Sequence, residues 1–173
     1  MKIIWGLYFF VLFVTSCNKD NNNTTTTKKG CDIQKVYSDN AKKVTITNGV
    51  WGTVSNVEGD CMPTVPTCSS CCRNCPVQRT VRIFQYTLLS EGVTSDPYGV
   101  FYDSFTTQLV TQVDTDEKGF FQADIPPGNY TIVIVENGKL YANISDGRGG
   151  LSPFTVTTGI LNANLFMTYK ATF

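Results

Sequence analysis

The chain has 173 residues, with 14 basic and 14 acidic side chains, seven cysteines and no histidine. This length fits one folded domain with terminal extensions, and the balanced charge offers no basic surface for nucleic acid. The absence of histidine excludes Ser-His-Asp and Cys-His nucleophile systems and all imidazole metal sites.

The N-terminus has the features of an export signal. Lys2 supplies the positive charge, and residues 3–14 form an uninterrupted apolar run. Because a membrane-spanning helix needs about 20 apolar residues, this run is too short to span and matches the hydrophobic region of a secretory signal. We therefore expect a signal peptide over residues 1–16.

The end of this signal resembles a bacterial lipobox. Val14-Thr15-Ser16-Cys17 places a branched apolar residue and two small residues before a cysteine. In lipoproteins this cysteine is acylated and becomes the mature N-terminus, and two acyl chains already anchor a protein stably. The resemblance implies palmitate-type acylation at Cys17 and a membrane anchor without a spanning segment. The alternative is an ordinary signal peptide with an incidental cysteine.

Residues 17–30 are expected to be the acylated cysteine and a disordered tether, because Asn, Thr and Lys dominate and nothing can bury apolar surface. The thirteen residues of 18–30 would span roughly 20 Å. Lys19-Asp20 resembles, incompletely, the Lys-plus-acidic export tag of Bacteroidetes surface lipoproteins, since Asn21 replaces a second acidic residue. The expected location is the outer membrane, on its periplasmic face or at the cell surface.

From about residue 43 the apolar residues alternate with a period of two, and no helical periodicity is evident. The pattern predicts a bent first strand followed by further short strands, at 44–47 with 50–54, 80–87, 109–114, 119–125, 130–135, 140–144, 154–158 and 161–170. Strand 80–87 should direct Val81 and Ile83 to one face and Arg82, Phe84 and Tyr86 to the other. Strand 130–135, apolar on both faces, should be central.

Two turns are predicted between these strands. Residues 114–119 indicate a hairpin turn stabilised by Asp side chains, and Pro126-Pro127-Gly128 favours a type II turn with positive φ at Gly128. Together the elements predict an all-β fold, an antiparallel β-sandwich of about seven or eight strands over residues 31–173. A Cys-rich insert, residues 56–79, separates its first two strands.

Several of these segments resemble the carboxypeptidase regulatory-like (transthyretin-like) β-sandwich. The similar segments are Gly49-Val-Trp-Gly-Thr-Val54, Val81-Arg-Ile-Phe84, Thr115-Asp-Glu-Lys-Gly-Phe-Phe121 and Ile125-Pro-Pro-Gly-Asn-Tyr-Thr-Ile132. The resemblance covers roughly residues 49–137 and extends to small Bacteroidetes lipoproteins with this domain. It implies a non-catalytic accessory module and carries no catalytic residues. The Cys-rich insert departs from the family pattern.

Six cysteines remain once Cys17 is set aside. Because the expected location is oxidising and the number is even, a disulfide framework is predicted. Fifteen pairings are possible, although Cys31 is expected to tie the N-terminal segment to the domain. A thiolate metal or redox site in residues 61–75 is the alternative, but the two C-x2-C pairs abut. The candidates are Cys31, Cys61, Cys68, Cys71, Cys72 and Cys75.

Aromatic residues give the second set of candidate contact residues. Loop rings could pack onto an open end of the sandwich, or stack on a glycan or a protein partner; the same two interpretations apply to Trp51. The loop residues are Tyr98, Phe101, Tyr102 and Phe105. Asp114-x-Asp116-x-x-Gly119 resembles the start of a calcium loop, but it lacks oxygen ligands at its later positions, so no metal and no cofactor are expected.

The sequence therefore predicts a non-catalytic lipoprotein, anchored in the outer membrane through Cys17, with a structural or protein-interaction role. No motif links the carboxylates Asp103, Asp114, Asp116, Glu117 and Asp124 into an acid–base pair. A glycan-binding module that uses residues 98–105 is the alternative binding function. The expected partners are the membrane and an outer-membrane protein or a glycan, with no nucleic acid.

Overall fold

The structure is a computed structural model that describes residues 31–63, 65–66, 68 and 71–173. The predicted signal peptide, the lipidation site at Cys17 and the tether lie outside the described residues. Among the described helices, none is long and apolar enough to cross a membrane.

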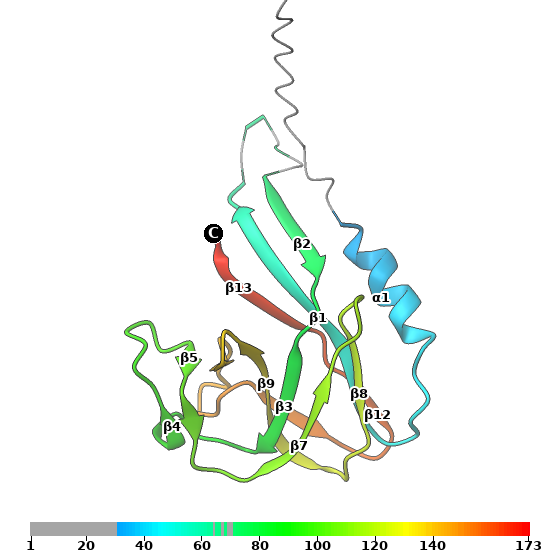
Figure 1. Ribbon diagram of the computed structural model, residues 1–173, viewed down its shortest axis with the longest axis vertical. Coiled ribbons are helices and arrows are strands. Elements are labelled where there is room, and N and C mark those ends of the chain that lie inside the picture. The colour runs from blue at the N-terminus through cyan, green and yellow to red at the C-terminus, as the bar shows by residue number, and fades with distance from the viewer. Residues whose placement is uncertain (1–30, 64, 67, 69–70) are drawn as a thin grey trace, which may run out of the picture.

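Two β-sheets form a sandwich, as predicted (Figure 1). The first sheet contains β12 (Ile160–Asn162), β1 (Gly49–Asp60), β13 (Leu165–Thr172), β2 (Cys72–Pro76) and β8 (Phe120–Ala123). The second contains β5 (Phe101–Tyr102), β10 (Lys139–Tyr141), β9 (Gly128–Glu136), β3 (Thr80–Gln85), β7 (Leu109–Asp114) and β11 (Pro153–Val156). A small ribbon pairs β4 (Gly92–Val93) with β6 (Ser104–Phe105), and a 3-10 turn (Leu89–Glu91) precedes β4.

The main core lies between the two sheets and draws side chains from both. Val50, Val54 and Met167 of the first sheet pack with Val81 and Ile83 of the second, and all five are fully buried. The outer face of the second sheet carries a further buried cluster, formed by Phe84, Tyr102, Val133, Leu140, Ala142 and Leu151. β9 is thus covered on both faces and lies between β3 and β10, which confirms its predicted central position.

The first and last strands of the sandwich run parallel. The sequence had predicted only antiparallel pairing, so this part of the prediction was wrong. β1 pairs in parallel with both β12 and β13. The predicted continuous last strand is interrupted where Ala163 donates its N–H to the Trp51 carbonyl over 2.8 Å. A Cβ on Gly52 would lie 2.0 Å from the Ala163 carbonyl oxygen, so this close approach requires glycine.

The turn at 114–119 is not a hairpin turn, because the strands it joins lie in different sheets. β7 pairs with β3, whereas β8 pairs with β1. The predicted Asp stabilisation is present: the Asp116 carboxylate accepts N–H bonds from Lys118 and Phe120, at 2.8 and 3.0 Å. Gly119 takes φ of +70° and its carbonyl accepts the Val54 N–H. Local turn chemistry was predicted correctly, but the pairing of the flanking strands was not.

The predicted positive φ at Gly128 is also wrong. Gly128 does not have a positive φ and instead begins β9. Its role is steric, since a Cβ there would lie 3.1–3.2 Å from the ring and hydroxyl of Tyr130. The Tyr130 hydroxyl donates to the Pro126 carbonyl over 2.9 Å, an arrangement that resembles the tyrosine corner of other β-sandwiches.

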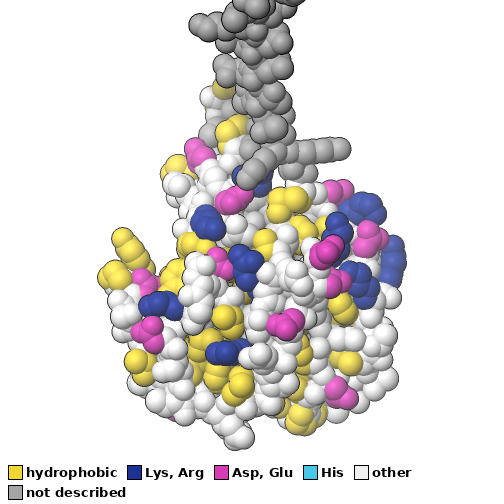
Figure 2. All heavy atoms as spheres, viewed as in Figure 1, with side chains coloured by type: hydrophobic (Ala, Val, Ile, Leu, Met, Phe, Trp, Pro, Cys, Tyr) yellow, Lys and Arg dark blue, Asp and Glu magenta, His cyan; other side chains and the backbone are white. Residues whose placement is uncertain are grey.

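One helix, α1 (Ile33–Ala41), was not predicted. Asp32 caps it by accepting the Lys35 N–H at 3.0 Å. The helix is docked by Asn40, whose fully buried amide donates to the Thr53 hydroxyl and the Lys118 carbonyl. Acidic and basic side chains intermix over this part of the surface (Figure 2), and the pKa of Asp39 is lowered to about 2 by its hydrogen bonds with Lys35 and Lys42.

Candidate functional site

All six described cysteines are paired, which confirms the disulfide interpretation. The bonds are Cys31–Cys75, Cys61–Cys72 and Cys68–Cys71, with Cα–Cα distances of 5.1, 4.6 and 5.5 Å. The alternative thiolate site would need reduced cysteines, and none of these six sulfurs is a free thiol. Within the described residues, no group of three or more Cys, Asp and Glu side chains could hold a metal ion.

The Cys-rich insert extends the first sheet as a β-hairpin. The second half of β1 pairs antiparallel with β2, so that Gly59 lies opposite Cys72 and Asn56 lies opposite Cys75. The Cys61–Cys72 disulfide links the two strands at the base of the loop that connects them. Few apolar side chains are available here, so the cross-links and the strand pairing replace a hydrophobic core.

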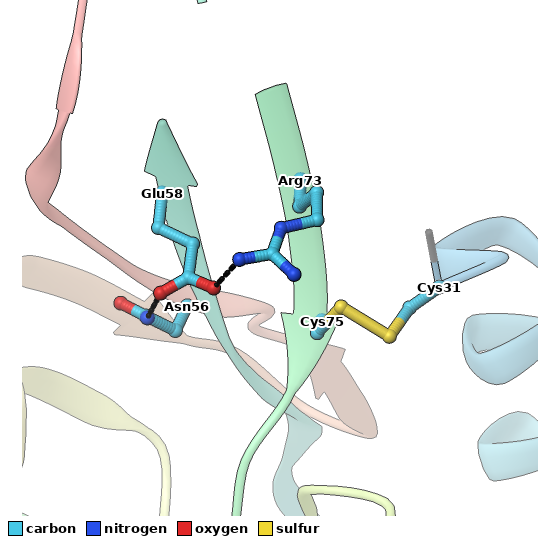
Figure 3. Close-up of a disulfide and its surroundings, with 5 residues drawn as sticks. All are labelled: Cys31, Asn56, Glu58, Arg73 and Cys75. Atoms are coloured by element: carbon cyan, nitrogen blue, oxygen red, sulfur yellow. Dashed lines mark hydrogen bonds and ion pairs between the residues drawn. A yellow bond between two sulfur atoms is a disulfide. The ribbon is translucent and has the colours of Figure 1, made fainter. Parts of the chain in front are cut away.

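The Cys31–Cys75 disulfide joins the hairpin to the residues just before the N-terminal helix. Figure 3 shows Cys31, just before α1, reaching across to Cys75 in β2. On the same strand pair, the Arg73 guanidinium contacts the Glu58 carboxylate at 2.5 Å, and Asn56 donates to the other oxygen of Glu58 at 3.4 Å. The predicted role of Cys31, to tie the N-terminal segment to the domain, is confirmed. The described chain therefore begins at a covalently fixed point.

Three of the four aromatic loop residues pack against the two hydrophobic clusters: Phe101 against the main core, and Tyr102 and Phe105 in the cluster on the outer face of the second sheet. Tyr102 is 1% exposed and donates its hydroxyl to the Gly99 carbonyl. Phe105 contacts Phe84 edge-on, with ring centroids 5.1 Å apart, and Phe101 packs against Tyr141 and Tyr169 at the same distance. Tyr102 is therefore not free to stack on a glycan, and Phe101 and Phe105 are half-buried and use their rings in packing.

Tyr98 differs from these three because it is 86% exposed. It lies in a turn around Asp96, whose carboxylate accepts backbone N–H bonds from Tyr98, Val100 and Phe101. Desolvation opposes ionisation of Asp96, but these bonds outweigh it and lower the pKa of Asp96. Trp51 lies in β1 of the first sheet and is half-buried, with its ring centroid 6.5 Å from that of Phe120. The structure does not bring the candidate aromatic residues together into one site.

A cavity that the sequence did not indicate lies beside the second sheet. Its volume is about 480 Å³, and its walls come from the end of β3, the start of β9, the 145–150 loop and β11. The lining residues are Tyr86, Asn129, Asp146, Arg148, Pro153, Phe154 and Thr155. They are separated by up to 69 positions in the chain, so no local motif could have revealed them. The sequence did indicate that Tyr86 should lie on the face of its strand opposite to Val81 and Ile83.

Comparison with known family models, with curated proteins and with solved structures found no match for this chain.

Proposed function

We propose that this protein is an exported lipoprotein, anchored to the outer membrane through Cys17, that presents a non-catalytic β-sandwich of the carboxypeptidase regulatory-like type for a structural or protein-interaction role. The observation that carries the proposal is the set of three disulfides at one end of the domain. Disulfides of this density are typical of proteins that fold in an oxidising compartment, in agreement with the export signal in the sequence.

The position of the Cys31–Cys75 disulfide suits an anchored protein. Thirteen residues separate Cys17 from Cys31, so the proposed anchor is close in the chain to the first disulfide-bonded residue of the domain. Cys31 is itself fixed to β2, so a pull on the N-terminal segment would act on a covalent bond rather than on the end of a nine-residue helix. The disulfides would keep the domain folded close to the membrane.

The carboxyl groups support a non-catalytic role. A general acid needs a carboxyl with a raised pKa. Where the pKa of a carboxyl is shifted, it is lowered instead, by hydrogen bonds or charges from backbone N–H groups, lysines, an arginine or tyrosines. Asp39 makes these interactions on α1, Glu136 makes them at the end of β9, and the others make them in turns and loops: Asp96, Asp103, Asp116 and Asp146. Each of these carboxyl groups has a structural partner that favours its ionised form.

Metabolic labelling with an alkyne-bearing palmitate tests the anchor. We expect the full chain to incorporate the label and to sediment with outer membranes, whereas Cys17→Ala should be unlabelled. Cys31→Ser is the matched control, because it removes a cysteine that the structure places in a disulfide, and it should stay labelled. Equal labelling of Cys17→Ala and the full chain would refute anchoring at Cys17.

Crosslinking in intact cells tests the interaction role. We expect the anchored full chain to yield a reproducible crosslink to a defined outer-membrane protein, identified by mass spectrometry. A chain that gives no crosslinked species in repeated experiments, although it is labelled and folded, would contradict the interaction role while leaving the anchor intact.

A further inference from the structure

The cavity beside Tyr86 is built on three aligned strands. Tyr86 follows β3 and donates its N–H to the Asn129 carbonyl, and Asn129 pairs in turn with Thr155 of β11. Residues in register on neighbouring strands direct their side chains to the same face of a sheet. Tyr86, Asn129 and Thr155 therefore form one row across the sheet, at the floor of a cavity of about 480 Å³.

The 145–150 loop forms the wall of this cavity, and it is held firmly in place. The Asp146 carboxylate accepts the Tyr86 hydroxyl at 2.6 Å and the N–H groups of Arg148 and Gly150 at 2.7 and 3.0 Å. Leu151 donates its N–H to the Thr87 carbonyl, and a Cβ on Gly150 would come within 2.3–2.7 Å of the Tyr86 ring and hydroxyl. The site is therefore formed before any ligand arrives, which lowers the entropic cost of binding.

Two donor groups in the cavity have no partner in the described part of the chain. The Arg148 guanidinium makes no hydrogen bond or ion pair there. Asn129 uses its side-chain oxygen to accept the Thr155 hydroxyl at 2.8 Å, and its amide nitrogen makes no further bond within the same residues. The cavity thus presents unused N–H groups beside a fixed carboxylate acceptor.

Charge and shape together favour a neutral, polyhydroxylated ligand. Asp146 and Arg148 contribute opposite charges, so the cavity has no net charge to attract a strongly ionic ligand. The Tyr86 ring and Pro153 add apolar surface among the polar groups, and the volume lies in the roughly 300–1,000 Å³ range of small-molecule sites. Hydroxyl groups both donate and accept. A sugar ring can therefore accept hydrogen bonds from Asn129 and Arg148 and donate one to the remaining acceptor site of Asp146, while its carbon face contacts Tyr86.

We propose that the cavity formed by Tyr86, Asn129, Asp146, Arg148, Pro153 and Thr155 is a binding site for a neutral saccharide. The cavity lies at the end of the second sheet where β3 ends, and Figure 1 shows that this end is opposite to β2 and the start of α1. An anchored domain would hold the site away from the membrane. This site goes beyond the proposed function and stands or fails independently of acylation at Cys17.

A glycan array, followed by calorimetry, provides the test. The full chain is purified in an amine-oxide detergent, because maltoside detergents carry sugar headgroups. It is applied to an array of neutral and acidic oligosaccharides with zwitterionic tripeptides alongside. We expect binding to neutral oligosaccharides. Binding to acidic glycans or tripeptides alone, or to none of the probes, would overturn the assignment.

Three variants locate the site. Arg148→Ala, Asn129→Asp and Tyr86→Ala should each weaken binding of the strongest neutral hit by about tenfold or more, because each removes a hydrogen-bonding group or the apolar wall. Arg148 and Asn129 are exposed, so these two variants should keep the urea midpoint of the parent chain. Tyr98→Ala, which removes an exposed ring outside the cavity, should bind normally. Unchanged binding by Arg148→Ala and Asn129→Asp, or lost binding by Tyr98→Ala alone, would refute the site.

Discussion

The Cys31–Cys75 disulfide should make the largest contribution of the three cross-links to stability. The test replaces both cysteines, in Cys31→Ser/Cys75→Ser, so that no free thiol remains to form new pairs. The disulfide closes a loop with a sequence separation of 44 residues. Without this bond, the unfolded chain can move more freely between residues 31 and 75. The entropy that it gains is the largest of the three disulfides, because this closed loop is the longest.

The magnitude follows from the length of the closed loop. The chain-entropy relation gives about 4 kcal/mol at 25 °C for a separation of 44 residues. Cys61–Cys72 lies inside this loop and shortens the free path by 11 residues, which lowers the value by only about 0.3 kcal/mol. The same relation gives about 1.6 kcal/mol for Cys68–Cys71, with a separation of 3.

Urea unfolding of the detergent-purified chain measures this difference. The chain has two tryptophans, and Trp5 lies in the predicted signal peptide, so the fluorescence of the mature protein reports on Trp51 in β1. With a slope of about 2 kcal/mol per M, we expect the midpoint of Cys31→Ser/Cys75→Ser to fall by about 2 M. Cys68→Ser/Cys71→Ser, the matched control, should shift by less than 1 M. A larger loss in the control than in Cys31→Ser/Cys75→Ser would refute the reasoning.

Three further predictions concern the sandwich. Gly52→Ala should destabilise the fold by about 2 kcal/mol or more, because its Cβ would overlap the Ala163 carbonyl oxygen; an unchanged thermal midpoint would contradict the close approach. Tyr130→Phe should cost about 1 kcal/mol through loss of the bond to the Pro126 carbonyl, measured by urea unfolding, and a neutral effect would show that the corner is not stabilising. Burial of Glu136 opposes its ionisation, but hydrogen bonds from Arg79 and Tyr169 lower its pKa below 4.5. Its contribution to stability should therefore be present above about pH 4.5 and lost as the pH falls through the lowered pKa; Glu136→Gln should flatten the fall in urea midpoint below pH 4.5, and an unchanged slope would contradict this.

The sequence predicted most of the longer strands, because alternation of apolar residues directly reflects burial on one face. The predicted strand at 44–47 is absent from the described part of the chain, and β2 lies within what was predicted to be an insert. Strand 109–114 has the predicted bounds in β7. Val81 and Ile83 point into the main core and Phe84 points to the opposite cluster, as expected. The segment predicted as the last strand, 161–170, likewise buries alternate residues at Ala163, Leu165 and Met167.

Strand direction and pairing were not predictable in the same way. The period of a strand says which residues face inward but does not say which neighbour it pairs with, or whether the two run parallel. The parallel pairing of β1 with β13 depends on close contact between Gly52 and Ala163, 111 residues apart in the chain. The turn at 114–119 shows the same limit, since its Asp116 bonds are local but its strands belong to different sheets.

Helix α1 was not predicted because the sequence of this segment carries little helical signal of its own. Isolated helices shorter than about 12 residues are marginal in water, and this one has nine residues and little apolar surface. Its stability comes from tertiary contacts of Asn40 and from the nearby Cys31–Cys75 disulfide. The cavity at Tyr86 could not be predicted from the sequence either, because only strand pairing brings Asn129 and Thr155 beside Tyr86.

The intact mass of the full chain, purified from membranes with and without reduction and alkylation, tests the central claim most directly. We expect a mass that lacks residues 1–16 and includes acyl chains on Cys17. Reduction should add six hydrogens, two for each disulfide, and only then should six cysteines react with the alkylating agent. An unprocessed, unacylated chain would contradict the anchor. Cysteines that are alkylated without reduction, or a metal adduct lost in acid, would contradict the disulfide-linked domain.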